Sequence, residues 1–187
     1  MVSRATEGTY RVHGDTYRAY NSNLASGVSM SSVSVPCKVS SLKTLLVSHR
    51  GQASATGKNN HSITNRSKGK LTEYYFQVGS TRMPQKPVKV DVQGAEVQME
   101  LQKALHQLGH KRAVVSYTPD QFVLESSAVA TQGSFVIGMD MESFSGKSDT
   151  MNQGVSTIAQ PVFFNGTYNA TAEAQNISVF AHYDQVL

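Results

Sequence analysis

The strongest β-sheet signal in the chain lies in its last third, where three strand-like runs read SFVIGMDME (134–142), AQPVFF (159–164) and NISVFAHYDQVL (176–187). Residues 143–157, which are rich in Ser, Gly, Asn and Thr, separate the first two runs. Short apolar runs divided by polar turns are typical of an all-β sandwich or barrel. These runs gather no cluster of catalytic side chains, so this part of the chain predicts a sheet building block rather than an enzyme.

Further strands are predicted upstream, where apolar residues alternate with polar ones or form a compact run. They lie at 33–37, 42–47, 71–78, 88–92, 114–117 and 121–124. The stretch 79–87, which contains Pro84 and Pro87, predicts a break between two of these strands. Residues 50–70 are rich in Gly, Ser, Asn and Lys and predict a long exposed loop, which is unusual unless it is functional or packs against another chain.

One helix is predicted, from about Ala95 to Leu108. Its apolar residues recur at three- and four-residue spacing and form a single stripe, made of Val97, Leu101, Ala104, Leu105 and Leu108. Gly109 follows where a left-handed cap is expected. The stripe predicts that the helix packs one face on a sheet or on a neighbouring subunit.

Together these elements predict a mainly β fold, a jelly-roll β-sandwich or barrel with one inserted amphipathic helix. A length of 187 residues favours one domain, or at most two small ones. Residues 1–30 offer few large anchors and predict a weakly structured N-terminal segment. Residues 31–187 then form the predicted jelly-roll domain.

Composition excludes several classes of protein. No run of about 18 apolar residues occurs, so no transmembrane helix is predicted. Residues 1–20 lack the apolar region of a signal peptide. Cys37 is the single cysteine, which excludes an intramolecular disulfide, and its strand-like context predicts a buried structural thiol.

Charge is unevenly distributed along the chain. Residues 1–70 hold ten Lys and Arg against two acidic residues, and residues 71–187 hold seven against eleven. The net charges are therefore +8 and −4. A basic half can contact nucleic acid or an acidic neighbouring subunit, or can form a solvated face. The aromatic residues expected of a single-strand binding groove are not interleaved with these basic residues.

Two motifs resemble binding sites but lack required residues. Gly146-Lys147-Ser148 looks like the end of a phosphate-binding loop, yet Met141 stands where that loop needs glycine. His106 and His110 are four residues apart and could share a metal, but Gln107 replaces the glutamate of the metalloprotease motif. We interpret this pair as solvated.

Acid–base constellations are equally weak. His49, His182 and Asp184 could supply part of a Ser/His/Asp triad, but the sequence has no Gly-x-Ser-x-Gly elbow. Asp140 and Glu142 would share a face of a strand and could form a metal or acid–base pair, although a rim or inter-subunit contact is the favoured interpretation. We therefore predict no catalytic, cofactor-binding or metal-binding residue.

The order of the pieces resembles the C-terminal jelly roll of double-jelly-roll viral major capsid proteins, the lineage of adenovirus hexon, Polinton-type elements and virophages. The resemblance covers about residues 30–187. It rests on VSVP with SLK (33–36, 41–43), LTEYYFQVGS with MP and KPV (71–80, 83–84, 86–88), the helix 95–108, and FVIGMDME, GVST and FAHYDQVL (135–142, 154–157, 180–187).

This resemblance implies a non-enzymatic subunit of an icosahedral capsid, of a virus or a virus-derived transposable element, located in the virion after assembly in the host cell. It implies homotrimers in which each subunit contributes two barrels. The chain is long enough for one barrel, so we expect either one barrel of a larger capsid protein or a standalone single-barrel protein.

Two other functions fit the same fold class. A β-sandwich binding module would present loops to a glycan or a host receptor. A cupin-like enzyme would need several histidines and a carboxylate converging inside the barrel, and the six histidines show no His-x-His signature.

Overall fold

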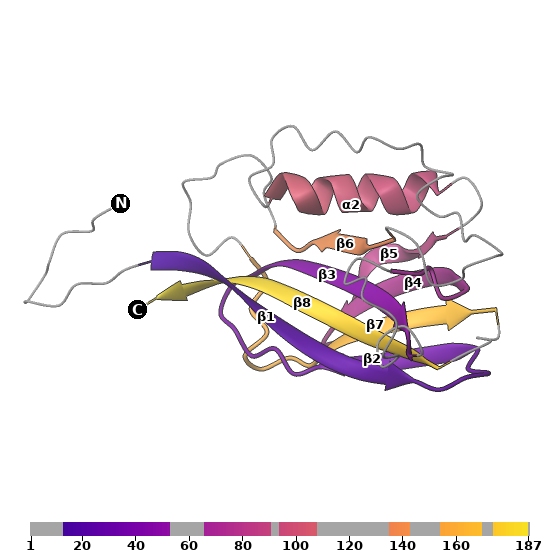
Figure 1. Ribbon diagram of the computed structural model, residues 1–187. Helices are drawn as coiled ribbons and strands as arrows, with labels where there is room; N and C mark the ends of the chain where they lie inside the picture. Colours follow the sequence, from indigo (N-terminus) through magenta and orange to yellow (C-terminus); the bar gives the residue numbers. More distant parts are fainter. Residues whose placement is uncertain are drawn as a thin grey trace, which may run out of the picture.

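The computed structural model describes residues 13–52, 66–90, 94–107, 135–142, 154–169 and 174–186. Eight strands and one helix lie in these ranges, and the strands form two four-stranded sheets (Figure 1). In chain order the elements are β1 (His13–Leu24), β2 (Met30–Val35), β3 (Leu42–Gly51), β4 (Leu71–Val78), β5 (Thr81–Lys89), α2 (Ala95–Gln107), β6 (Ile137–Asp140), β7 (Val162–Tyr168) and β8 (Gln175–Val186).

The strand order is that of a jelly roll. The first sheet has the order β1-β8-β3-β6 and the second has the order β2-β7-β4-β5. The first strand pairs with the last, the second with the seventh, the third with the sixth and the fourth with the fifth, all antiparallel. This nested pairing describes one long hairpin rolled into two facing sheets. The predicted mainly β jelly-roll fold with one inserted helix is therefore confirmed.

The core fills the space between the two sheets. In β7 every second residue is buried, as expected for a strand with one face on the core. Phe164 of β7 packs on Phe76 of β4, with ring centroids 5.3 Å apart. Leu45 of β3 and Ile177 of β8 are fully buried and contribute from the first sheet. Aromatic rings of the second sheet thus pack in one core with branched aliphatic side chains of the first.

Helix α2 packs on the first sheet through the predicted apolar face. Its main contacts are with β6, and it makes smaller contacts with β3 and β5. Val97, Leu101 and Ala104 are buried, which confirms the stripe predicted from the sequence. Gly138 of β6 lies directly beneath the helix, because a Cβ atom there would stand 2.7 Å from the Cβ of Ala104. Leu108 and Gly109 lie outside the described residues.

Strand β1 corrects the prediction of weak structure at the N-terminus, which is wrong for residues 13–24. All twelve residues of β1 pair with β8. Among the residues of β1 whose burial is described, Leu24 alone is fully buried. An edge strand of this kind has little apolar alternation, and its partner lies at the far end of the sequence, so local pattern does not reveal it.

Strand β5 corrects the predicted break at residues 79–87, because it runs through both Pro84 and Pro87. It stands at the edge of the second sheet and pairs with β4 alone among the described strands. An edge strand tolerates proline, since one side of its backbone needs no partner. The register of the pair shifts between Tyr74 and Phe76.

The predicted exposed loop at residues 50–70 is wrong at both ends. Arg50 and Gly51 belong to β3, and the backbone N–H of Ser67 donates to the carbonyl of His49 at 3.0 Å. Ser67 is buried. Residues 53–65, the stretch 143–153 and the strands predicted at 114–117 and 121–124 lie outside the described residues.

Candidate functional site

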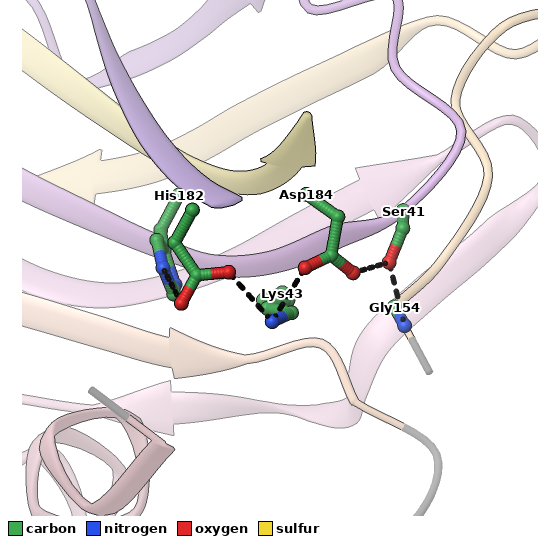
Figure 2. Close-up of polar contacts among 6 residues, drawn as sticks. Ser41, Lys43, Gly154, His182 and Asp184 are labelled. Carbon is green, nitrogen blue, oxygen red and sulfur yellow. Dashed lines mark hydrogen bonds and ion pairs between the residues drawn. The ribbon is translucent and has the colours of Figure 1, made fainter. Parts of the chain in front are cut away.

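Among the described residues, a group of interacting polar side chains lies on the outer face of the first sheet, where β1, β8 and β3 run side by side (Figure 2). The Nζ atom of Lys43 is 2.6 Å from Oδ1 of Asp184 and 2.9 Å from Oδ1 of Asp15. The side chains of Lys43 and Asp184 are 14% and 9% exposed, whereas that of Asp15 is 52% exposed. Residues from three neighbouring strands therefore meet in one ion-pair cluster.

A β-bulge positions Lys43 in this cluster. Leu42 pairs with Tyr183 and Thr44 pairs with His182, so Lys43 is an extra residue in β3. A bulge turns a side chain away from the regular alternation of the strand. Here it lets Lys43 reach Asp184 while Leu42 stays fully buried.

Ser41 closes the cluster on the side opposite Asp15. Its hydroxyl donates to Oδ2 of Asp184 at 2.7 Å and accepts the backbone N–H of Gly154 at 3.1 Å. Both oxygens of Asp184 are thus engaged, one by Lys43 and one by Ser41 (Figure 2). Ser41 is fully buried, so its hydroxyl acts as a link between strands and not as an accessible nucleophile.

His182 lies beside Asp15 and under Tyr17. Its Nε2 is 3.6 Å from Oδ2 of Asp15, and the ring of Tyr17 stacks on it with centroids 4.6 Å apart. Burial lowers the pKa of His182, although Asp15 opposes that shift. Its Nδ1 and the hydroxyl of Thr44 are buried and have no hydrogen-bond partner in the structure. The neutral form of His182 is therefore favoured.

The contacts of Lys43 and Asp184 determine the protonation states of these two side chains. Burial alone would lower the pKa of Lys43, but the hydrogen bonds with Asp184 and Asp15 outweigh it and raise that pKa. Burial would likewise raise the pKa of Asp184, but the hydrogen bonds from Lys43 and Ser41 lower it. Both groups are therefore held in their charged forms. A structural ion pair needs these forms, whereas a nucleophilic lysine must lose its proton.

The two histidines of the triad hypothesis lie in different parts of the sandwich. Inside the sandwich, the Nε2 atom of His49 lies 3.0 Å from the hydroxyl of Tyr168. Burial lowers the pKa of His49 to about 4. His182 and Asp184 lie on the outer face, where Ser41 bonds to Asp184 and not to a histidine. The structure therefore brings Ser41 and Asp184 together but assembles no Ser/His/Asp relay from these residues.

Asp140 and Glu142 are joined by a local turn. The backbone N–H of Glu142 donates to Oδ1 of Asp140 at 2.9 Å, just after β6 ends. Burial raises the pKa of Glu142, and Lys43 partly offsets that shift. Within the described ranges no three His, Cys, Asp or Glu side chains are grouped closely enough to hold a metal ion.

Other sequence predictions concern Cys37, the pair His106 and His110, and Gly146-Lys147-Ser148. Cys37 is buried, as expected, and burial raises the pKa of its thiol. His106 lies in α2, but His110 and Gly146-Lys147-Ser148 fall outside the described residues. In the described part of the chain no helix is long and apolar enough to cross a membrane.

A shallow groove lies between β5 and α2. It is lined by Pro84, Lys86, Pro87, Val88, Glu96, Met99 and Glu100. Its carboxylates are paired with lysines. Oε1 of Glu96 lies 4.0 Å from Nζ of Lys86, and Oε1 of Glu100 lies 2.6 Å from Nζ of Lys103. The groove therefore offers an apolar surface whose rim carries both acidic and basic side chains. These side chains do not converge as catalytic groups would.

Sequence reasoning missed Lys43, Asp15 and Ser41. Lys43 and Asp15 are 28 positions apart, and Ser41 and Asp184 are 143 apart. No local motif links such positions, because strand order alone brings them together. The one usable signal was the pair His182 and Asp184, two apart on a strand and so on one face.

No family model matches the sequence, and no curated protein matches it. Solved structures that match the chain include two viral capsid proteins, and the first of these two has a similar fold. The Faustovirus major capsid protein matches with a TM-score of 0.56 and 8% identity, over 95% of this chain and 34% of its own. The mavirus major capsid protein matches with a TM-score of 0.44 and 9% identity, over 94% of this chain and 38% of its own. This chain therefore spans little more than a third of the length of either protein.

Proposed function

We propose that this chain is a structural subunit of an icosahedral capsid, of a virus or of a virus-derived transposable element. The observation that carries the proposal is the nested pairing of eight strands with a helix between β5 and β6, in a chain of which 95% matches the Faustovirus major capsid protein at a TM-score of 0.56. The proposal places the protein in the virion and gives it no catalytic activity.

The finer proposal concerns lineage and assembly. We place the chain in the double-jelly-roll lineage of adenovirus hexon, Polinton-type elements and virophages, and we propose that it forms trimeric capsomers with sibling subunits. Its partial coverage of the Faustovirus protein supports one barrel of a larger capsid protein. That barrel comprises residues 31–187 together with β1. We propose no nucleic-acid contact, since no comparison supports one.

The polar cluster fits a structural role. Lys43, Asp184 and Ser41 join β3, β8 and the segment at Gly154 through charge-assisted contacts whose central groups are nearly closed to solvent. A catalytic site needs a group that substrate can reach, whereas a shell protein needs strands that stay in register. The cluster holds neighbouring strands in register.

Sedimentation equilibrium of the purified protein tests the proposal. We expect trimers or larger assemblies, because a capsid subunit must bury an interface of about 1,600 Å² or more with each strongly bound neighbour. A persistent monomer that binds a ligand on a glycan array would favour the binding module instead. Stoichiometric iron, manganese or zinc in the purified protein would favour the cupin-like enzyme.

A further inference from the structure

The first half of strand β1, residues 13–19, has few side-chain anchors. β1 lies at the edge of the first sheet and pairs with β8 alone among the described strands (Figure 1). Its core contacts lie in the second half, where Leu24 is buried and Tyr20 packs against the core. Among residues 14–19, by contrast, no side chain is fully buried. The ion pairs and ring contacts that the structure describes between this half and other strands involve Asp15 and Tyr17.

Both of these side chains lie against His182 of β8. Tyr17 pairs with His182 in the register, and its ring stacks on the imidazole with centroids 4.6 Å apart and planes inclined by 20°. Tyr17 is 56% exposed, whereas the side chain of His182 is 4% exposed, so the phenol ring forms the outer layer. A weakly anchored strand therefore shields a titratable group from water.

The attached strand favours the neutral form of His182. The distance of 3.6 Å from its Nε2 to Oδ2 of Asp15 is longer than a hydrogen bond, and the other oxygen of Asp15 already accepts a hydrogen bond from Lys43 at 2.9 Å. Nδ1 of His182 is buried and meets no acceptor in the described part of the chain. An imidazolium here would therefore bury an N–H group without a partner, which is unfavourable.

Charged and titratable groups face His182 from its own strand and from the strands beside it. Burial is the largest effect on the imidazole, and it lowers the pKa of His182. Asp15 and Asp184 oppose that shift, whereas Lys43 reinforces it. The groups are Asp15 and Tyr17 of β1, Lys43 of β3, Asp184 of β8, and Asp140 and Glu142 at the end of β6.

We propose that His182 makes the attachment of residues 13–19 to β8 sensitive to acid. When this half of β1 lifts away, Tyr17 no longer covers the imidazole, and water can stabilise its charged form. The detached strand therefore leaves His182 with about its ordinary pKa of 6.5, above that of the attached form. Attachment is then fully favoured above pH 6.5 and weakens as the pH falls, because the detached form binds a proton that the attached form excludes.

Detachment in acid changes the edge of the first sheet. It removes the partner of the C-terminal part of β8, since residues 13–19 pair with residues 180–186. An unpaired strand edge is a site at which another chain can pair. The inference goes beyond the proposed capsid function, because contacts within a single chain carry it.

Hydrogen exchange of the backbone amides measures how firmly this half of β1 is attached. In wild type, the protection of the amides of residues 13–19 that bond to β8 should fall several-fold between pH 7.5 and pH 5, after correction for the intrinsic exchange rate at each pH. The ceiling is about 30-fold, because an imidazole with a pKa of 6.5 is protonated by about 30 to 1 at pH 5. His182→Gln does not titrate and should lose most of this fall.

Two substitutions of Tyr17 test the shield without changing the titrating group. Tyr17→Phe keeps the stacked ring, so its fall in protection should match that of wild type. Tyr17→Ala uncovers His182 in the attached form, so its fall should shrink, whatever the variant costs at pH 7.5. Tyr17 lies at the surface, so both variants should fold, and circular dichroism checks that they do.

The pH dependence at residues 13–19 must also be separated from that of global unfolding. His49 is fully buried between the sheets, so His49→Gln should change global unfolding and leave the fall at residues 13–19 as in wild type. Protection that stays constant or rises in acid would overturn the inference. So would a fall in Tyr17→Ala or His182→Gln as large as that of wild type.

Discussion

The side chain of Lys43 lies between two carboxylates of neighbouring strands, and its loss would leave Asp184 without its cation. We expect Lys43→Met to lower the free energy of unfolding by about 2 kcal/mol, below the full cost of breaking a buried pair because Asp15, the second partner of Lys43, is 52% exposed. Lys103→Met is the control, since the Lys103–Glu100 pair is more exposed and its loss should cost less than about 0.5 kcal/mol. Urea denaturation measures both, and equal losses would contradict the assigned role.

The lowered pKa of His49 should make the free energy of unfolding depend on pH. Its folded pKa of about 4 lies below the ordinary value of 6.5, so the unfolded chain binds a proton that the folded chain excludes. The contribution of His49 to the free energy of unfolding should therefore be fully present above pH 6.5. It should fall by about 3 kcal/mol in all as the pH drops toward 4. Burial lowers the pKa of His182 too, so it acts in the same direction.

A His49→Gln variant isolates this contribution. Glutamine does not titrate, so the loss of stability between pH 6.5 and pH 4 should shrink, whatever the variant costs at neutral pH. Urea denaturation at a series of pH values gives the slope. A slope equal to that of wild type would mean that His49 is not the group responsible.

At the scale of elements, the sequence predicted helix α2 well because its signal is local. The spacing of Val97, Leu101 and Ala104 depends on neighbouring turns of one helix and on nothing else in the chain. Strands β1 and β5 were missed for the opposite reason. Both are edge strands, so apolar alternation is weak in β1, and proline is tolerated in β5.

The contact between α2 and β6 depends on Gly138. A Cβ there would lie 2.7 Å from the Cβ of Ala104 and 3.0 Å from Cδ1 of Leu101, so the helix would have to move outward. We expect Gly138→Ala to lower the free energy of unfolding by about 1–3 kcal/mol. Thermal denaturation followed by circular dichroism measures the change.

Two variants control that experiment. Gly14→Ala in β1 should be nearly neutral, because a Cβ at this position meets nothing within 4 Å. Ala104→Gly combined with Gly138→Ala should recover part of the loss, less about 1 kcal/mol for glycine inside a helix. If Gly138→Ala is as stable as Gly14→Ala, the close packing of α2 on β6 is wrong.

At the scale of the whole molecule, the sequence predicted the fold class but not the polar cluster. Alternating apolar runs were enough to indicate a jelly roll, since each run reports its own strand. The cluster of Asp15, Lys43 and Asp184 depends on which strands become neighbours and on the bulge in β3. Neither is written in a local pattern, so the cluster appears once the two sheets are assembled.

Electron microscopy of the purified protein can show whether this jelly roll builds a capsid. The chain should be produced with any sequence that flanks it in its reading frame, purified and imaged. We expect trimeric blocks that assemble into hexagonally packed sheets or closed shells. Dispersed monomers that form no ordered assembly under any concentration or salt condition would contradict it.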